Sequence, residues 1–178
     1  MPGGSRAVFL DRDGVLVRAL AGAGAPRSAA TVDELELLPD AAEACASLKA
    51  AGFTLVVVTN QPEIARGTID ADTVARQNAV LREALPVDEV IVCPHDDADD
   101  CDCRKPKPGM LLDAAARLEL DLSESFMVGD RWRDVEAGRR AGCRVTFVDR
   151  GYEERLRHEP DAVVRGVGAA AEWILALS

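Results

Sequence analysis

Short apolar runs alternate along the chain with segments in which apolar residues recur every three or four positions. The runs are rich in Val, Leu and Phe and predict β-strands over residues 7–10, 54–58, 87–92, 126–128, 144–148 and 162–164. The periodic segments predict helices over residues 40–51, 70–85, 108–118, 132–141 and 168–177. Strands that alternate with helices are typical of an open parallel sheet with helices on both faces. The pattern therefore predicts an α/β fold.

Cap and turn residues bound these elements. Asp40 is a candidate N-cap of the first helix, Gly52 is a stop after it, and Pro108 stands near the first turn of the third helix. Residues 19–30 are rich in Ala and Gly and poor in core residues, which indicates a surface loop. Because no repeat or linker interrupts the pattern, residues 1–178 are expected to form a single domain.

The composition argues against several classes of protein. Apolar residues make up 48% and charged residues 29%, as in globular rather than disordered proteins. The formal net charge of −10 disfavours nucleic acid and anionic membranes as partners. No stretch approaches the roughly 20 apolar residues of a membrane span, and the first apolar run is too short for a signal-peptide core. We expect a cytoplasmic protein that acts as a monomer on a small metabolite.

Polar residues directly follow three of the predicted strands. They are Asp11 and Asp13 after the first strand, Thr59, Asn60 and Gln61 after the second, and Asp130 and Asp134 after the fourth. Ligands of open α/β sheets bind at the carboxyl ends of the strands, so these clusters are expected to meet at one edge. Each motif alone is common in turns and helix caps. Their shared placement favours a functional site.

The three clusters contain the parts that phosphoryl transfer requires. Of two aspartates two positions apart, one can act as a nucleophile and the other as an acid/base for the leaving oxygen. A third carboxylate, Asp130, can complete a site for a hard cation such as Mg²⁺. Thr59 offers a hydroxyl and a backbone N–H to a phosphate, and Lys105 offers a positive charge. We therefore expect chemistry on a phosphate ester.

The loop at residues 93–108 contains three of the five cysteines and one of the two histidines. These residues form a Cys3His set suited to tetrahedral Zn²⁺: Cys93, His95, Cys101 and Cys103. Four protein ligands leave no open position for water, which favours a structural zinc over a hydrolytic one. A disulfide and unligated thiols are the alternatives. Cys45 and Cys143 are expected to be ordinary core residues.

A zinc ion bound to Cys103 would also order the residues that follow it. Arg104 and Lys105 come next in the chain, so the metal would hold a loop that delivers cations to a phosphate. Lys105 is expected to hold the phosphoryl group and Arg104 to contact the rest of the substrate. The alternative for Arg104 is a surface arginine paired with the acidic run at residues 96–100.

Four ordered motifs resemble those of the haloacid dehalogenase (HAD) superfamily of Mg²⁺-dependent phosphatases. They are FLDRDGV, VVVTNQ, CxCRKPxPGM and VGDxxxD, and they span about residues 7–148. They are most similar to those of a small, nearly capless branch that contains heptose bisphosphate phosphatases and histidinol-phosphate phosphatases. The resemblance implies a Rossmann-like sheet with an inserted zinc-binding loop.

The resemblance also implies roles for individual residues. Asp11 would be the nucleophile that forms an aspartyl-phosphate, and Asp13 the general acid/base. Mg²⁺ would be held by the Asp11 carboxylate, the Asp13 carbonyl and Asp130, with Asp134 supporting that site. The groups expected at the phosphate and the substrate are Thr59, Asn60, Gln61, Arg104 and Lys105.

The motifs favour a sugar phosphate as the substrate. TNQxxIARG and KPxPGM are more similar to the heptose enzymes than to the histidinol enzymes, although Pro62, Glu63 and Arg131 depart from the heptose pattern, as does the Ala- and Gly-rich loop. The expected reaction is removal of the 7-phosphate from D-glycero-D-manno-heptose 1,7-bisphosphate. The alternatives are histidinol-phosphate hydrolysis and a non-enzymatic phospho-accepting domain. Asp13 argues against the latter, since such a domain needs no acid/base.

Overall fold

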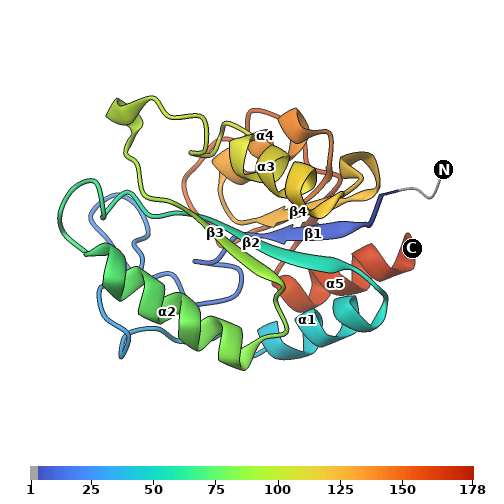
Figure 1. Cartoon of the computed structure of the whole chain (residues 1–178), viewed down its shortest axis with the longest axis horizontal. Coiled ribbons are helices and arrows are strands. Elements are labelled where there is room, and N and C mark those ends of the chain that lie inside the picture. The colour runs from blue at the N-terminus through green and yellow to red at the C-terminus, as the bar shows by residue number, and fades with distance from the viewer. Residues whose placement is uncertain (1–3) are drawn as a thin grey trace.

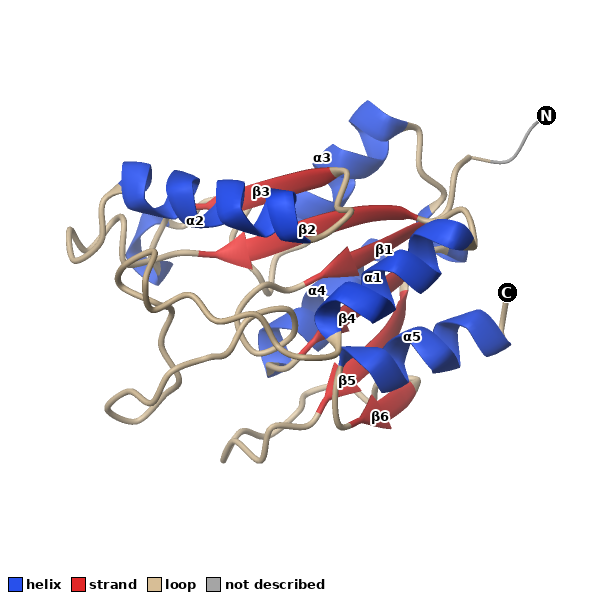
Figure 2. Cartoon of the chain, turned by 90° about the horizontal axis from the view of Figure 1, so that it is seen from below, coloured by secondary structure: helices blue, strands red, loops and turns tan. Residues whose placement is uncertain are grey.

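The computed structural model describes residues 4–178, which form a parallel β-sheet with strand order β3-β2-β1-β4-β5-β6 (Figure 2). The strands are β1 Ala7–Leu10, β2 Thr54–Asn60, β3 Glu89–Cys93, β4 Phe126–Gly129, β5 Arg144–Val148 and β6 Ala162–Val164. All neighbouring strands in this sheet run parallel. The predicted open parallel sheet is therefore confirmed.

Helices cover both faces of the sheet, as the sequence pattern predicts. They are α1 Ala41–Ala50, α2 Ala71–Ala84, α3 Gly109–Leu118, α4 Trp132–Ala141 and α5 Val167–Ala176. In Figure 1, α3 and α4 lie above the sheet, and α1, α2 and α5 lie below it. Two short 3-10 turns, Asp97–Asp99 and Leu122–Glu124, were not predicted. In the described part of the chain, no helix is long and apolar enough to span a membrane.

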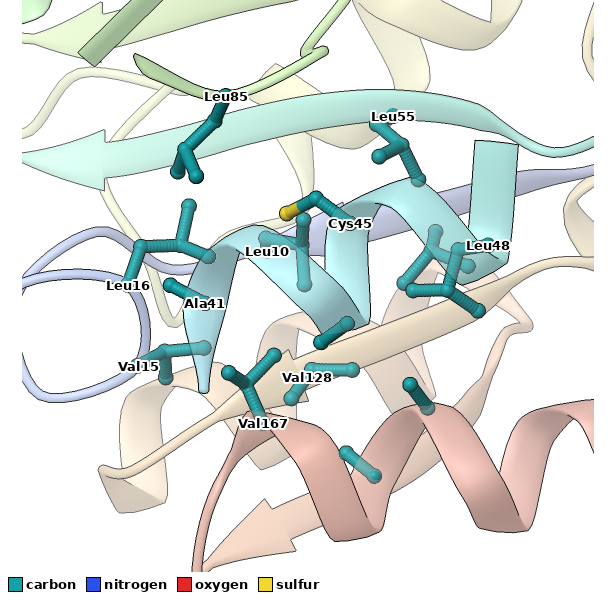
Figure 3. Close-up of a cluster of buried hydrophobic side chains, with 14 of the residues drawn as sticks. Leu10, Val15, Leu16, Ala41, Cys45, Leu48, Leu55, Leu85, Val128 and Val167 are labelled. Carbon is teal, nitrogen blue, oxygen red and sulfur yellow. The ribbon is translucent and has the colours of Figure 1, made fainter. Parts of the chain in front are cut away.

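The strands alternate their side chains between two cores. Val8 and Leu10 of β1 point into the core formed with α1 and α5, while Phe9 points into the core formed with α3 and α4. Burial on both faces explains why the strands read as continuous apolar runs. Cys45 lies in the first core (Figure 3) and Cys143 in the second, so both are core residues as predicted.

Asp40 differs from the sequence expectation. It stands at the N-cap position of α1, but its side chain makes no capping hydrogen bond to that helix. Its carboxylate Oδ2 instead accepts from the backbone N of Gly168, in the first turn of α5, at 2.9 Å. A Cβ at Gly166 would lie 2.5 Å from the same oxygen. Asp40 therefore ties together the two helices that pack side by side on this face.

The strand order places the functional loops together. The chain moves from β1 outward to β2 and β3, then returns to the other side of β1 to form β4. The loops that leave β1 and β4 therefore diverge at a topological switch point, where open α/β sheets bind their ligands. The fold thus brings the polar residues after β1, β2 and β4 to one edge, as expected.

Candidate active site

Three buried carboxylates gather at this edge, and one lysine binds two of them. Asp11 follows β1, Asp130 follows β4, and Asp134 lies in the first turn of α4; each contributes an oxygen to a cluster whose atoms all lie within 4.8 Å of one another. Lys105 Nζ donates to Asp11 Oδ1 at 2.9 Å, to Asp134 Oδ1 at 2.7 Å and to the carbonyl of Val58 at 2.8 Å. Lys105 is only 2% exposed. One ammonium cannot neutralise three carboxylates, so the cluster carries excess negative charge.

The excess charge changes the protonation equilibria of the cluster. Burial, with the negative charge of Asp134, raises the pKa of Asp11 to about 6, although Lys105 opposes the shift. Burial and the charges of Asp11 and Asp134 raise the pKa of Asp130 well above its usual value. Burial lowers the pKa of Lys105, but the two carboxylates outweigh it, so that the pKa is raised and the ammonium stays charged. The cluster therefore favours binding of a further cation.

The side chains fit a hard divalent cation. Asp130 Oδ1 is buried without a hydrogen-bond partner among the described residues. Asp134 is engaged by protein donors, since its Oδ1 binds Lys105 and its Oδ2 accepts from the backbone N–H groups of Asp130 and Arg131 at 3.1 and 3.0 Å. Mg²⁺ prefers carboxylate oxygens as ligands. Asp11 and Asp130 can thus hold the ion, while Asp134 supports the loop that carries Asp130.

Two glycines allow the backbone after β1 and at the end of β4 to lie directly against the carboxylates of the site. Gly14 has φ +86°, and a Cβ there would lie 1.9 Å from Asp130 Oδ2. At Gly129 a Cβ would lie 2.1 Å from the Cβ of Asp134. The glycines of the DRDG and VGD motifs therefore leave room for the carboxylates.

Asp13 lines the same cavity as Asp11 but has its own hydrogen-bond partners. It accepts from Gln61 Nε2 at 2.9 Å, from Ser28 Oγ at 3.2 Å and from Arg12 Nε at 3.1 Å. Gln61 was predicted to contact substrate, and the structure places its amide on Asp13 and on the hydroxyl of Thr59, at 2.9 Å each. Gln61 therefore links the ends of β1 and β2.

Asn60 holds the backbone of Lys105. Its Oδ1 accepts from the Lys105 N–H and its Nδ2 donates to the Lys105 carbonyl, both at 3.0 Å. The ammonium of Lys105 is fixed in turn by Asp11 and Asp134. β2 therefore positions the lysine through a side-chain clamp on its peptide groups, a role that the sequence did not indicate.

The cavity is about 300 Å³ and is lined by both acidic and cationic side chains. Its arginines are Arg27, Arg66, Arg104, Arg131 and Arg133. The loop at residues 19–30 is exposed over residues 21–25, as predicted, but its flanks also line this cavity.

Arg104 fits both interpretations of its sequence position. Its Nε donates to Asp97 Oδ1 at 2.8 Å, as the surface ion-pair alternative expects, and its side chain also lines the cavity. Arg133 donates to both oxygens of Asp97, at 3.0 and 3.1 Å. Asp97 of the acidic run therefore holds two cavity arginines together.

The four predicted zinc ligands gather at the end of β3. Cys93 Sγ lies 3.0 Å from Cys103 Sγ and 3.7 Å from Cys101 Sγ, and His95 Nδ1 lies 3.3 Å from Cys103 Sγ. Zinc–sulfur bonds of about 2.3 Å would separate tetrahedral thiolates by about 3.8 Å. The distances from Cys101 Sγ to Cys93 Sγ and Cys103 Sγ, 3.7 and 3.5 Å, are close to this value, whereas Cys93 Sγ and Cys103 Sγ lie closer together. All three cysteines are free thiols, not disulfides. Although burial opposes it, hydrogen bonds, first from the Arg104 backbone, lower the pKa of Cys101 to about 7.

Four buried or partly buried polar residues were missed by the sequence reasoning. Arg12, Ser28, Gln77 and Asn78 all belong to the network around Asp13. The signal that indicates them is weak: Gln77 and Asn78 share a helical stripe with the core residues Val74 and Leu81. Such a stripe is normally apolar, so polar members need buried partners.

Comparison with known proteins shows the family to which this chain belongs. The family model of the haloacid dehalogenase-like hydrolases matches residues 24–142. The chain is 39% identical over 158 residues to the D-glycero-beta-D-manno-heptose-1,7-bisphosphate 7-phosphatase of Pseudomonas aeruginosa, covering 86% of each chain. It is 37% identical to the enzyme of that name from Bordetella bronchiseptica, covering 94% of this chain and 97% of the relative.

The fold is also similar to that of a solved relative. The D,D-heptose 1,7-bisphosphate phosphatase of B. bronchiseptica, crystallised with magnesium and phosphate, superposes with a TM-score of 0.85 at 34% identity. The match covers 97% of this chain and 99% of that one. Sequence motifs, fold and buried carboxylates agree, and the chain belongs to the haloacid dehalogenase-like hydrolases, within the phosphatase branch that contains the heptose 1,7-bisphosphate 7-phosphatases.

Proposed function

We propose that the protein is a Mg²⁺-dependent phosphatase that removes the 7-phosphate from D-glycero-D-manno-heptose 1,7-bisphosphate. The observation that carries the proposal is the position of Lys105, which joins Asp11 and Asp134 beneath a cavity shared with Asp13. Relatives with this name are similar over most of the chain. A carboxylate nucleophile, a second carboxyl group and a fixed cation are the groups that hydrolysis through a phosphoenzyme needs.

In the first half of the reaction, Asp11 attacks the phosphorus while the bond from phosphorus to the sugar oxygen breaks. Lys105 stabilises the charge on the phosphoryl group, and protonated Asp13 gives its proton to the leaving oxygen. The products are the sugar alcohol, aspartyl-phosphate at Asp11 and ionised Asp13. Mg²⁺ bound by Asp11, Asp130 and the Asp13 carbonyl would neutralise charge on nucleophile and phosphate.

In the second half, water attacks the phosphorus and gives a proton to the Asp13 carboxylate. The bond between phosphorus and Asp11 breaks, inorganic phosphate leaves, and both aspartates return to their starting states. The three contacts to Asp13 from Gln61, Ser28 and Arg12 hold its carboxyl in place for both proton transfers.

The cavity favours a substrate with a second anionic group. The cavity lining contains arginines from four different segments, among them Arg27, Arg104 and Arg131. A second phosphate on the sugar would find cations there, whereas histidinol phosphate carries an amine and an imidazole in place of a second anionic group. A bisphosphate therefore suits the arginines of this cavity better than histidinol phosphate does.

Zinc is the proposed occupant of the Cys3His cluster, with a structural role. The ligand atoms of Cys93, His95, Cys101 and Cys103 are all protein groups, and they complete a tetrahedral set. The metal would fix the chain one residue before Arg104, which lines the cavity.

A substrate screen with Mg²⁺ tests the proposal. We expect the highest kcat/KM for heptose 1,7-bisphosphate, with the 1-phosphate as product, and lower values for sugar monophosphates and histidinol phosphate. Asp11→Asn should lose activity at least about 1,000-fold with an unchanged circular dichroism spectrum, because the amide is a poor nucleophile. A preference for histidinol phosphate would overturn the substrate assignment, and full activity of Asp11→Asn would overturn the mechanism.

A further inference from the structure

Helix α2 carries two buried polar side chains on the face turned toward the rest of the molecule. Gln77 is fully buried and Asn78 is 7% exposed, and both lie between the core residues Val74 and Leu81. A buried amide without hydrogen bonds costs free energy. The hydrogen-bond partners of these two amides therefore show which residues helix α2 positions.

Both amides bind the same guanidinium group. Arg12 Nη1 donates to Gln77 Oε1 at 3.2 Å and to Asn78 Oδ1 at 3.0 Å. Arg12 is 0% exposed, and its Nε and Nη2 donate to the two oxygens of Asp13 at 3.1 and 3.4 Å. A single buried guanidinium group thus connects α2 to the carboxyl group beside the nucleophile.

Gln77 reaches Asp13 by a second route. Its Nε2 donates to the carbonyls of Ala29 and Thr31, at 2.8 and 3.1 Å, which fixes the chain next to Ser28. The Ser28 hydroxyl then donates to Asp13. Helix α2 therefore fixes two of the three neighbours that hold the Asp13 side chain.

We propose that Gln77 and Asn78 are positioning residues that act through Arg12 to aim the Asp13 carboxyl group at the leaving oxygen of the substrate. The inference rests on the proposed function and deepens it. Asn78 gives the cleanest test, because its side chain oxygen binds Arg12 and lies outside the cavity. Loss of that acceptor leaves Arg12 Nη1 with Gln77 Oε1 alone on α2, which loosens the guanidinium group and, with it, the aim of Asp13.

The test uses two substrates that differ in their need for a general acid. A sugar phosphate releases a basic alkoxide that must be protonated, whereas p-nitrophenyl phosphate releases a stable phenolate that need not be. Since kcat/KM reports only the steps up to the phosphoenzyme, it isolates the acid role of Asp13 from its later role as a base. Asn78→Leu should lower kcat/KM by about 10- to 100-fold for heptose 1,7-bisphosphate and by less than about 3-fold for p-nitrophenyl phosphate.

Two further variants separate positioning from general damage. Asn78→Asp keeps an acceptor oxygen for Arg12 and should restore most of the activity on the sugar phosphate. Val74→Ala weakens the packing of the same helix and removes no hydrogen bond to Arg12, since Val74 is apolar. It should therefore lower the melting temperature and leave the ratio of the two kcat/KM values unchanged. If Asn78→Leu does not fold, Asn78→Ala provides the same comparison.

The outcomes distinguish the inference from the proposed function. If the unaltered enzyme hydrolyses neither substrate, the proposed function fails. If it is active but Asn78→Leu lowers both kcat/KM values equally, or lowers neither, the positioning role is overturned. The same holds if Val74→Ala changes the ratio as much as Asn78→Leu does.

Discussion

At the scale of single residues, the site depends on how closely its carboxylates can lie to Lys105 and to the neighbouring backbone. Lys105 donates to two carboxylates and a carbonyl at distances below 3 Å, which leaves little space around it. Gly14 lies against Asp130 with no room for a side chain. The motif glycines are therefore as much a part of the site as the aspartates that they accompany.

Gly14→Ala should reduce phosphatase activity by at least about 100-fold. An added Cβ would meet Asp130 Oδ2 at 1.9 Å and displace that carboxylate from the cation site. Gly52→Ala is the matched control, since Gly52 has a similar φ of +87° but nothing within 4 Å of its added Cβ. Both variants should lose about 1 kcal/mol from left-handed strain, as measured by urea unfolding. Equal activity in the two variants would contradict the steric argument.

At the scale of elements, the helices and the loop after β3 support the residues that form the site. α1 and α5 are joined through Asp40, α2 holds Arg12, and the loop after β3 carries the Cys3His cluster and Arg104. These supports differ in what their removal should affect. Loss of a helix contact far from the site should lower stability alone. Loss of order in the loop after β3 should lower catalytic activity.

Asp40→Ala should lower the free energy of unfolding by about 1 kcal/mol, because the Gly168 N–H loses its acceptor. Phosphatase kinetics should stay within about 2-fold of the unaltered protein, since Asp40 does not line the cavity. Denaturant unfolding and steady-state kinetics of the same preparation test both statements. An unchanged unfolding midpoint would show that the bond contributes nothing.

Cys101→Ser should remove most of the bound zinc and lower kcat/KM more than it lowers the melting temperature. Its thiol belongs to the Cys3His set beside Arg104 and Lys105, so loss of the metal should loosen the loop that they occupy. Cys143→Ser is the control, because Cys143 lies in the core and outside that set. Elemental analysis should give about one zinc per chain before substitution. A full complement of zinc in Cys101→Ser would refute the ligand assignment.

At the scale of the whole molecule, buried charge couples stability to pH and to the cation. Burial and Asp134 raise the pKa of Asp11 to about 6 in the metal-free fold, from 3.8 in a free side chain. An acid with a raised pKa stabilises the folded state when it is protonated, that is, below its unfolded pKa. This contribution is lost as the pH rises through about 6.

The Asp11 contribution to the free energy of unfolding should therefore fall between pH 4 and about 6 in Mg²⁺-free buffer. It is obtained as the difference between the unaltered protein and Asp11→Asn at each pH, measured by urea unfolding. Added Mg²⁺ should stabilise the unaltered protein more at pH 7 than at pH 5, because protons compete with the ion for the carboxylates. A difference that increases with pH without Mg²⁺ would contradict the assignment.

The local pattern was sufficient to predict the elements and their order. Four predicted ranges, at residues 7–10, 132–141, 144–148 and 162–164, coincide with β1, α4, β5 and β6. The ends of the other predicted helices and strands differ from the observed ends by one or two residues, because hydrogen bonds to neighbouring strands and caps decide where an element stops. Asp40 shows the limit: its identity suggested a cap for its own helix, but a partner 128 positions away competes for the carboxylate.

The sequence by itself determined the sheet, the identity of the acidic cluster and the Cys3His set, because each depends on residue types at fixed spacing next to a predictable strand. Only the tertiary structure decided which groups those residues bind. Asn60 clamps Lys105, and Gln61 and Ser28 hold Asp13. The physical reason is that hydrogen bonds between residues far apart in the chain depend on the packing of whole elements, and no local pattern along the chain records that packing.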